Sequence, residues 1–183
     1  LLQRVPPGTT LSVIDAQGKC VSPGLVDAHT HPVFAGNRAK EFSLRLSGAT
    51  YEEIQAAGGG IHNSANQTRA ASEEELFQAA MGRIRRSMEL GVTSFEAKSG
   101  YALTVEGELK SLRVIKMLNL LPPATLSPSL LAAHVVPREF AQDRAAYIRL
   151  ITDEILPRAA REKLATACDV FCETTAFSLE EAS

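Results

Sequence analysis

The sequence predicts an α/β fold in which helices cover a parallel sheet. Four short apolar segments have the length and composition of buried strands: the run that ends at His31, and residues 92–98, 130–134 and 169–173. Each of these segments is separated from the next one by at least one amphipathic helical pattern. Strands that alternate with helices in this way are joined by crossover connections, and neighbouring strands then run parallel.

Composition limits the classes of protein to consider. The chain has 183 residues with 45% hydrophobic and 22% charged residues, enough for one domain with a hydrophobic core. A formal net charge of -2 argues against nucleic acid or an anionic membrane as the main partner. The longest apolar region, residues 118–136, is interrupted by three prolines, so no membrane span is predicted. Cys20, Cys168 and Cys172 fit a reducing cytoplasm, and we expect the last two to be buried free thiols.

The first predicted strand carries the clearest chemical signal in the chain. An apolar run leads from Pro23 to His29 and His31, and Pro32 stops it. Side chains alternate faces along a strand, so the two imidazoles should point the same way at the end of the strand. Two such imidazoles can chelate one metal ion, and neutral imidazole suits zinc, iron, nickel and copper. The alternative is that two histidines close a strand without a chemical role.

A long connection follows this strand, from residue 32 to residue 71. It contains Gly36, Gly48 and a triplet at 58–60, and loops of this length in compact domains are usually functional or partly structured. Thr50 and Glu53 have the spacing of a capping box and predict a short helix there. The glycine triplet either lets backbone approach a ligand closely or forms a flexible hinge.

The later helices have recognisable beginnings and buried faces. Ser72 and Glu75 form a capping box, and Gly91 ends the helix that they begin. Further helices are predicted over 104–119, over 143–154, from Pro157 to about residue 164, and from Ser178, which has its own capping box with Glu181. The residues expected to face the core are Leu76, Ala80, Ile84, Met88, Leu109, Leu112, Ile115, Met117 or Leu118, Tyr147, Leu150 and Ile151.

Polar side chains follow each predicted strand, which favours one particular kind of parallel sheet. They are His29, His31 and Arg38 after the first strand, Tyr101 after the second, His134 after the third and Glu173 after the fourth. In a (β/α)8 TIM barrel the active site lies at these carboxyl ends, and a whole barrel needs about 250 residues. We therefore expect residues 23–183 to form the N-terminal half of a barrel, cut within the domain. Residues 1–22, with a predicted β-hairpin at 11–22, are expected to be a remnant of a separate N-terminal β-domain.

Several motifs together resemble a known family. His29-Thr30-His31-Pro32 after Pro-Gly-Leu-Val-Asp-Ala resembles the amidohydrolase superfamily, which consists of metal-dependent hydrolases. Four further segments look like the imidazolonepropionase family within it: Val-Phe-Ala-Gly-Asn-Arg at 33–38, Ala-Gly-Gly-Gly-Ile at 57–61, Glu-Ala-Lys-Ser-Gly-Tyr at 96–101 and Ala-His-Val-Val-Pro at 133–137. The resemblance covers essentially the whole chain. It implies hydrolysis of the cyclic amide C–N bond of 4-imidazolone-5-propanoate to N-formimidoyl-L-glutamate, in cytoplasmic histidine degradation.

The resemblance also implies roles for individual residues. His29 and His31 match metal ligands for one Zn²⁺ or Fe³⁺ ion, and Arg38 matches the residue that binds the propanoate carboxylate. Tyr101 and His134 match substrate-binding positions. The remaining metal ligands and the acid/base groups would lie after Ser183, so no catalytic residue is assigned and this chain alone is expected to be inactive. Considered without the resemblance, Arg38 would be a solvated charge, Tyr101 a packing residue and His134 a buried, hydrogen-bonded histidine.

The resemblance carries two further implications and two departures. It implies that the N-terminal β-domain is a small β-sandwich, and that the full-length protein forms a homodimer, as family members commonly do. Ala102 stands where the family pattern has Gly, and Thr174-Thr175-Ala176 replaces an expected Gly-containing stretch. These departures bear on the loops that follow the second and fourth predicted strands.

Two other functions remain open at this point. The chain could belong to another amidohydrolase, acting on a different ring amide or as a deaminase of an amino-heterocycle. It could also be a non-catalytic truncated isoform that binds a partner protein through an unpaired sheet edge. The combination of Arg38, Tyr101 and His134 argues against the first alternative, whereas the expected lack of further metal ligands favours the second.

Overall fold

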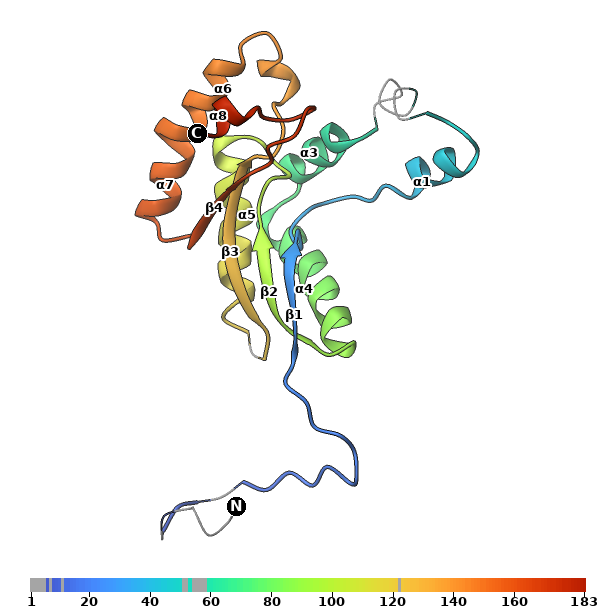
Figure 1. Ribbon diagram of the computed structural model, residues 1–183, viewed down its shortest axis with the longest axis vertical. Helices are drawn as coiled ribbons and strands as arrows, with labels where there is room; N and C mark the ends of the chain where they lie inside the picture. The colour runs from blue at the N-terminus through green and yellow to red at the C-terminus, as the bar shows by residue number, and fades with distance from the viewer. Residues whose placement is uncertain (1–5, 7, 11, 51–52, 54–58, 122) are drawn as a thin grey trace.

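A parallel four-stranded sheet forms the centre of the molecule (Figure 1). The structure is a computed structural model that describes residues 6, 8–10, 12–50, 53, 59–121 and 123–183. The strands are β1 (Leu25–Thr30), β2 (Val92–Lys98), β3 (Thr125–Ala133) and β4 (Ala167–Val170), and they lie in the order β1-β2-β3-β4. All three neighbouring pairs are parallel, which confirms the predicted α/β class and parallel sheet.

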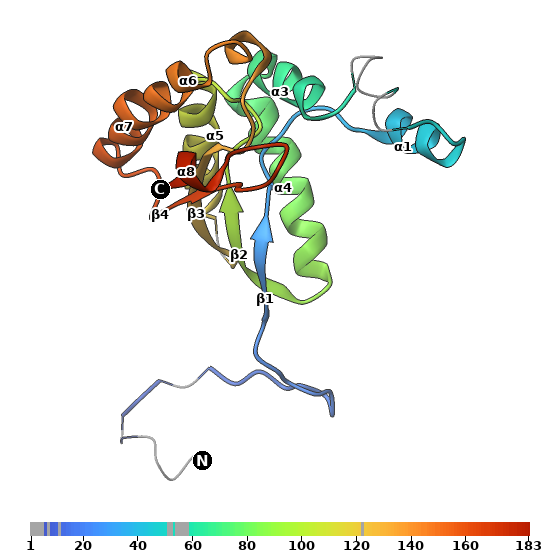
Figure 2. The same ribbon diagram turned by 45° about the horizontal axis from the view of Figure 1, so that its top comes forward.

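Helices connect successive strands. The α-helices are α1 (Ala39–Leu46), α3 (Ile61–Ala70), α4 (Glu73–Glu89), α5 (Val105–Leu118), α6 (Arg144–Leu150), α7 (Leu156–Arg161) and α8 (Leu179–Ala182). A short 3₁₀ helix, Arg138–Phe140, precedes α6, and a π-helical turn, Ile151–Ile155, joins α6 to α7. Helices α4, α5, α6 and α7 lie along one side of the sheet (Figure 2). None of these four helices covers the opposite face, which we call the open face, and the C-terminal segment drawn in red passes in front of its upper end.

The hydrophobic core lies between the sheet and these helices. Strands β2 and β3 contribute apolar side chains to it, and α4 and α5 supply the facing ones. The predicted inward residues of α4 and α5 are buried, except that Met88 is only partly buried. Leu118 rather than Met117 faces the core, because Met117 is 38% exposed. Buried core side chains include Phe95, Ala97, Leu126, Leu130, Leu76, Ala80, Ile84, Leu109, Leu112 and Ile115.

The predicted capping interactions are present. Ser72 and Glu75 form the complete capping box of α4, and Gly91 follows this helix with a φ of 94°, a conformation that glycine adopts readily. The box of Thr50 and Glu53 also forms, since the amide of Glu53 donates to Thr50 Oγ1 at 3.2 Å. The helix predicted from that box stays a prediction, because residues 51–52 and 54–58 lie outside the described part of the chain. The backbone of Gly58 is among them.

Helices α1 and α3 lie in the long connection after the first strand, for which the sequence predicted only a short helix near Thr50. Helix α3 has a polar sequence and buries only Ser64, Ala65 and Thr68, so it lacks the apolar stripe by which periodicity detects a helix. In α1 the apolar residues Phe42 and Leu46 are 64% and 75% exposed. Apolar residues that face solvent do not form a core-facing pattern, and the sequence therefore did not reveal this helix.

The hairpin predicted at 11–22 is not formed. Among residues 6, 8–10 and 12–24, as far as the structure describes them, no strand is present, and Leu11 is not described. The glycine-containing turn does form, with the Lys19 amide donating to Ala16 O at 2.9 Å. Val13 and Ile14 are more than 80% exposed, because no sheet in the described residues packs against this segment. The assignment of residues 1–22 to a separate domain stays a prediction.

Three boundaries differ from the predicted ones. Strand β3 begins at Thr125, before the predicted start, and includes Pro128. The predicted break before Pro157 is instead a π-helical turn, which keeps α6 and α7 continuous where proline removes a helical hydrogen bond. Strand β4 ends at Val170, so Glu173 lies beyond the strand on which it was predicted.

The cysteine prediction was half wrong. Cys20, Cys168 and Cys172 are free, as expected, but Cys168 and Cys172 are exposed rather than buried. Cys168 lies on β4, which has no strand on its outer side among the residues that the structure describes, and Cys172 lies just past the end of β4. No helix in the described residues is both long enough and apolar enough to cross a membrane.

Candidate functional site

Four of the residues predicted from sequence lie together where three strands end. The ring centroid of His31 is 5.7 Å from that of His29, 5.1 Å from that of Tyr101 and 5.2 Å from that of His134. The Tyr101 and His134 centroids are 5.4 Å apart. These residues follow or end β1, β2 and β3, so parallel strand order explains why residues 29 to 134 meet at one edge. We call His29, His31, Tyr101 and His134 the ring cluster.

The loop after β2 orients two of these imidazoles. His31 Nδ1 lies 3.1 Å from Ser99 O, and His134 Nδ1 lies 2.9 Å from Gly100 O. A carbonyl oxygen only accepts hydrogen bonds, so each Nδ1 must carry the proton and donate it. Each Nε2 is then left with its lone pair, which is the form of imidazole that binds a metal or accepts a proton.

Burial keeps these two histidines neutral. Burial lowers the pKa of His31 to about 4, with the nearby His134 adding to the effect and the Ser99 carbonyl opposing it. Burial also lowers the pKa of His134, against the opposing hydrogen bond to Gly100. Both imidazoles are therefore uncharged near neutral pH.

The donor set of His29 and His31 fits a metal ion in its chemistry. His31 is neutral, and its Nδ1 is engaged by a backbone carbonyl, which is the usual arrangement behind a metal-binding histidine. The neighbouring His29 ring brings a second imidazole from the same strand end. Within the described part of the chain, however, no group of three or more His, Cys, Asp or Glu side chains is arranged to hold a metal. The structure thus offers two ligands together.

Arg38 is held elsewhere by a carboxylate. Its Nε donates to Glu41 Oε2 at 2.7 Å across the first turn of α1, and its side chain is nearly half exposed. Burial would raise the pKa of Glu41, but the hydrogen bond and charge of Arg38 outweigh it, and the pKa is lowered. None of the ring contacts among the described residues includes Arg38. Its predicted meeting with the ring cluster is therefore not seen here.

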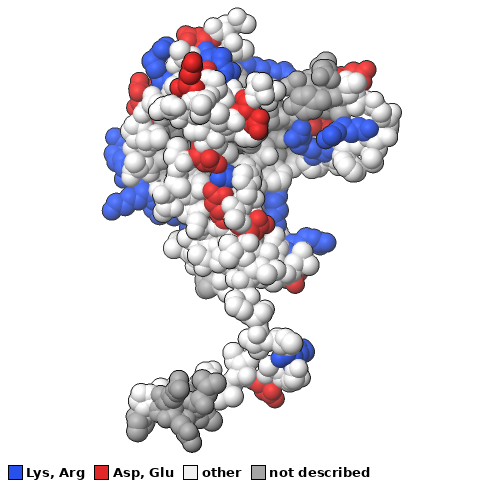
Figure 3. All heavy atoms as spheres, viewed as in Figure 1, with Lys and Arg blue, Asp and Glu red and all other residues white. Residues whose placement is uncertain are grey.

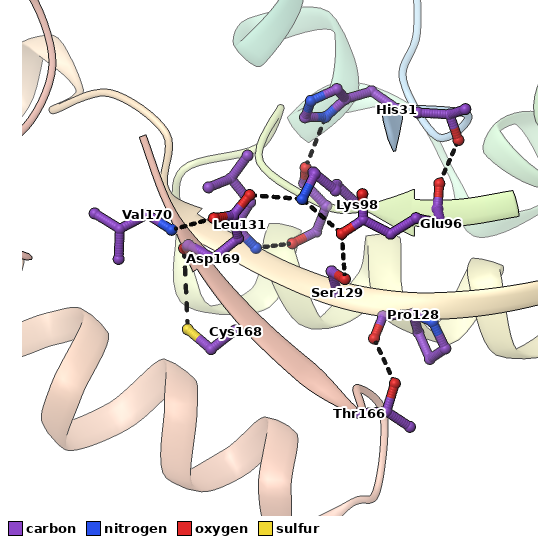
Figure 4. A network of polar contacts seen from close by, with 12 residues as sticks. His31, Glu96, Lys98, Pro128, Ser129, Leu131, Thr166, Cys168, Asp169 and Val170 are labelled. Atoms are coloured by element: carbon purple, nitrogen blue, oxygen red, sulfur yellow. Dashed lines mark hydrogen bonds and ion pairs between the residues drawn. The ribbon is translucent and has the colours of Figure 1, made fainter. Parts of the chain in front are cut away.

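An ion network centred on the buried Lys98, on the open face of the sheet, was missed in the sequence. Lys98 Nζ donates to Glu96 Oε1 at 2.6 Å and to Asp169 Oδ2 at 2.5 Å, and Ser129 Oγ donates to the same Glu96 oxygen at 2.8 Å (Figure 4). Figure 3 shows acidic side chains gathered over the strands of this face. The signal was present: charged residues at positions 96 and 98 share one face of a strand.

The charges in this network stabilise one another. Burial would lower the pKa of Lys98, but the hydrogen bonds and charges of Asp169 and Glu96 outweigh it and raise the pKa. The hydrogen bond from Lys98 lowers the pKa of Asp169. Burial would raise the pKa of Glu96, yet hydrogen bonds from Lys98 and Ser129 lower it. The network therefore carries one cation and two anions at neutral pH, beside His29.

Two phenylalanines extend the ring cluster and were also missed. The Phe34 centroid is 5.7 Å from that of Tyr101, and the guanidinium of Arg83 lies 3.5 Å above the Phe34 ring. Phe171 stands edge-on to His134, with 5.7 Å between centroids. Single aromatic residues after strands carry no distinctive sequence signal, so only the structure reveals them as walls of the site.

Comparison with known proteins gives one consistent result. No family model matches the chain. An imidazolonepropionase of Myxococcus xanthus is 55% identical over 178 residues, covering 97% of this chain and 42% of the relative. Imidazolonepropionases of Brevibacillus brevis and Geobacillus thermodenitrificans are 49% and 50% identical over 92% and 93% of the chain, and each is covered to 40%. The chain is thus homologous to imidazolonepropionases over nearly its whole length and spans about two fifths of theirs.

Proposed function

We propose that this chain is part of an imidazolonepropionase, a hydrolase of carbon-nitrogen bonds in cyclic amides. The reaction opens the ring of 4-imidazolone-5-propanoate to N-formimidoyl-L-glutamate in histidine degradation. The observation that carries the proposal is the ring cluster: three separate strand ends bring four of the five expected site residues into contact. The similarity to imidazolonepropionases supports it.

Each residue has a distinct part in the proposed reaction. His29 and His31 would hold one zinc or ferric ion, which supplies Lewis acidity for hydrolysis when bound. Tyr101 and His134 would contact the imidazolone ring, with a lone pair at His134 Nε2 available to accept a hydrogen bond from it. Arg38 would bind the propanoate carboxylate, since a guanidinium matches a carboxylate in shape and charge. Its Nε is already engaged by Glu41, which leaves the two terminal nitrogens for substrate.

The fold supports a larger architecture than the described sheet. Four parallel strands in sequential order, with the crossover helices on one side, are the arrangement of half a (β/α)8 barrel. We propose that the open polar face, with Lys98 and its carboxylates, is the interior of such a barrel. Residues 1–22 would belong to a small β-sandwich. We further propose that the enzyme is cytoplasmic, in agreement with its free cysteines, and that the complete protein forms homodimers.

A substrate panel on the complete protein tests the proposed function. The panel contains 4-imidazolone-5-propanoate, the same ring without its carboxylate, and a dihydropyrimidine amide. We expect turnover of the first compound and little of the others. Arg38→Met should raise KM for the propanoate compound and leave turnover of the compound without carboxylate unchanged, whereas Arg45→Met, an exposed arginine of the same helix, should change neither. Preferred hydrolysis of the dihydropyrimidine would instead indicate another amidohydrolase.

A further inference from the structure

The carboxylate of Glu108 lies fully buried beneath the loop that joins β2 to α5. It accepts backbone hydrogen bonds from Gly100 at 2.8 Å, Ala102 at 3.0 Å and Leu103 at 2.7 Å. Burial raises the pKa of this carboxyl, and hydrogen bonds from the Ser99 side chain and these amides oppose the rise. A buried carboxylate is costly unless such donors surround it, so the side chain and the loop depend on each other.

The same loop orients the histidines of the ring cluster. The peptide unit between Ser99 and Gly100 directs its N–H to Glu108 Oε2 and its C=O to His31 Nδ1. In a trans peptide these two groups point in opposite directions. Glu108 and His31 therefore bind the two opposite edges of one peptide unit. The next carbonyl, of Gly100, accepts the hydrogen bond from His134 Nδ1.

The backbone of this loop needs outside support. Gly100 has a φ of 105°, and a Cβ there would lie 2.8 Å from Leu131 O and 3.1 Å from His134 Nδ1. Leu103 has a φ of 57°, which is uncommon for a residue other than glycine. With two positive φ angles within four residues, the observed backbone conformation of this loop has little intrinsic preference over other conformations, and surrounding contacts must select it. The hydrogen bonds to Glu108 select the conformation in which both carbonyls face the imidazoles.

We propose that Glu108 is a positioning residue for the site: by fixing the loop of residues 99–103, it sets the tautomer and orientation of His31 and His134. Glu108 acts through the backbone, since its carboxylate oxygens accept hydrogen bonds from the amides of Gly100, Ala102 and Leu103. The inference deepens the proposed function, because it identifies what prepares His31 for a metal and His134 for substrate. It also explains why a charged residue lies in the buried side of an otherwise amphipathic helix, a feature that a packing role alone does not require.

The first test reads the imidazole tautomers in the complete wild-type protein. Histidine is labelled with nitrogen-15, and the ring signals are assigned with the variants His31→Asn and His134→Asn. Near neutral pH and without added metal, both rings should be neutral and protonated at Nδ1. A neutral His31 or His134 protonated at Nε2 would overturn the proposal, since neither ring could then donate to the loop carbonyls.

The second test changes Glu108 to Gln. The single amide oxygen can keep the two bonds to Ala102 and Leu103, which places its NH₂ group against the Gly100 N–H, donor facing donor. The 99–100 peptide unit then loses its acceptor, so the His31 ring should populate the Nε2–H tautomer. The matched control is Glu106→Gln on the same helix, because the Glu106 side chain is 70% exposed and pairs with Arg158.

Zinc affinity and the kinetic constants of E108Q distinguish a positioning role of Glu108 from a purely structural one. With zinc alone as the probe, E108Q should bind about 10- to 100-fold more weakly, the usual loss when a group behind a metal ligand is removed. With saturating metal, kcat should fall and KM for 4-imidazolone-5-propanoate should rise, because the loop of residues 99–103 carries Tyr101 and orients His134, both proposed to contact the substrate. Folded E108Q with wild-type tautomers and zinc affinity would refute the inference.

The shorter carboxylate of Glu108→Asp decides the question if E108Q does not fold. E108D keeps the charge and should show an intermediate change at His31 with wild-type zinc binding partly retained. If the ring signals of His31 in E108D are the same as in the wild type, with Nδ1 still protonated, the inference is overturned. A different result would refute the proposed function alone: the wild-type complete protein shows the expected tautomers but does not hydrolyse 4-imidazolone-5-propanoate.

Discussion

Replacement of Lys98 by methionine should destabilise the chain strongly. The Lys98 residue is 4% exposed, and its ammonium is shared by Glu96 and Asp169. Methionine keeps much of the length and removes the charge, so the substitution leaves two carboxylates on the open face of the sheet without their cation. Removing one partner of a buried pair costs more than the pair itself contributes, because the remaining charge stays desolvated.

The expected loss follows from the number and exposure of the contacts. Each hydrogen bond to a charged group contributes about 1.5 to 3 kcal/mol, and Lys98 makes two of them. The side chains of Glu96 and Asp169 are 24% and 42% exposed, so water screens part of the repulsion that remains. We therefore expect K98M to lower the free energy of unfolding by about 2 to 4 kcal/mol.

Urea unfolding as a function of pH measures both the size and the origin of this loss. The pKa values of Glu96 and Asp169 are lowered in the folded state, so their pairing stabilises the protein above their unfolded pKa values of about 4 and is lost as pH falls through the folded values. The pKa of Lys98 is raised, so its contribution is present below about pH 10.4 and is lost as pH rises through the folded value. The penalty of K98M should therefore be largest between these limits.

Lys116→Met is the matched control, because Lys116 is exposed on α5. This control should change the free energy of unfolding by less than about 0.5 kcal/mol at any pH. A K98M penalty of similar size to the control, or one that does not shrink in acid, would refute the ion network as a source of stability.

Three further substitutions test the packing of the helices that support the site. Ser72→Ala removes the cap of α4 and should cost about 1 kcal/mol in urea unfolding, whereas an unchanged midpoint would show that the capping box contributes nothing. Tyr147→Phe removes a buried hydroxyl that donates to Ala132 O at 2.9 Å, and it should cost about 1 to 3 kcal/mol; a stabilised variant would contradict that bond. Leu112→Ala leaves a cavity between α5 and the sheet and should cost about 2 to 5 kcal/mol by thermal unfolding, while a loss below that of Ser72→Ala would contradict its core position.

Residues with a local signal were predictable from sequence, and residues that depend on distant contacts were not. The strand that carries His29, the capped start of α4 at Ser72 and the parallel sheet all follow from periodicity and capping patterns. Helix α3 was missed because its buried residues are polar or small. Glu108 looked like one more acidic residue in the first turn of a helix, and only the folded loop shows its three amide partners.

Prediction of the site shows the same division. His31, Tyr101 and His134 meet because parallel strands end at a common edge, a property of the predicted topology. Arg38 lies at the start of a helix that the sequence pattern did not reveal, and its contact with Glu41 depends on that helix. The pairing of Lys98 with Asp169 joins residues 71 positions apart, and no local pattern encodes it.

Hydrolysis in oxygen-18 water tests the central proposal most directly. The complete protein, supplied with zinc or iron, is incubated with 4-imidazolone-5-propanoate, and the product is identified by mass spectrometry. The account predicts N-formimidoyl-L-glutamate with one heavy oxygen in the new carboxylate, and loss of this product in His29→Ala and His31→Ala. Absence of the product from the wild-type reaction, or a product without heavy oxygen, would contradict the assignment of the ring cluster to this hydrolysis.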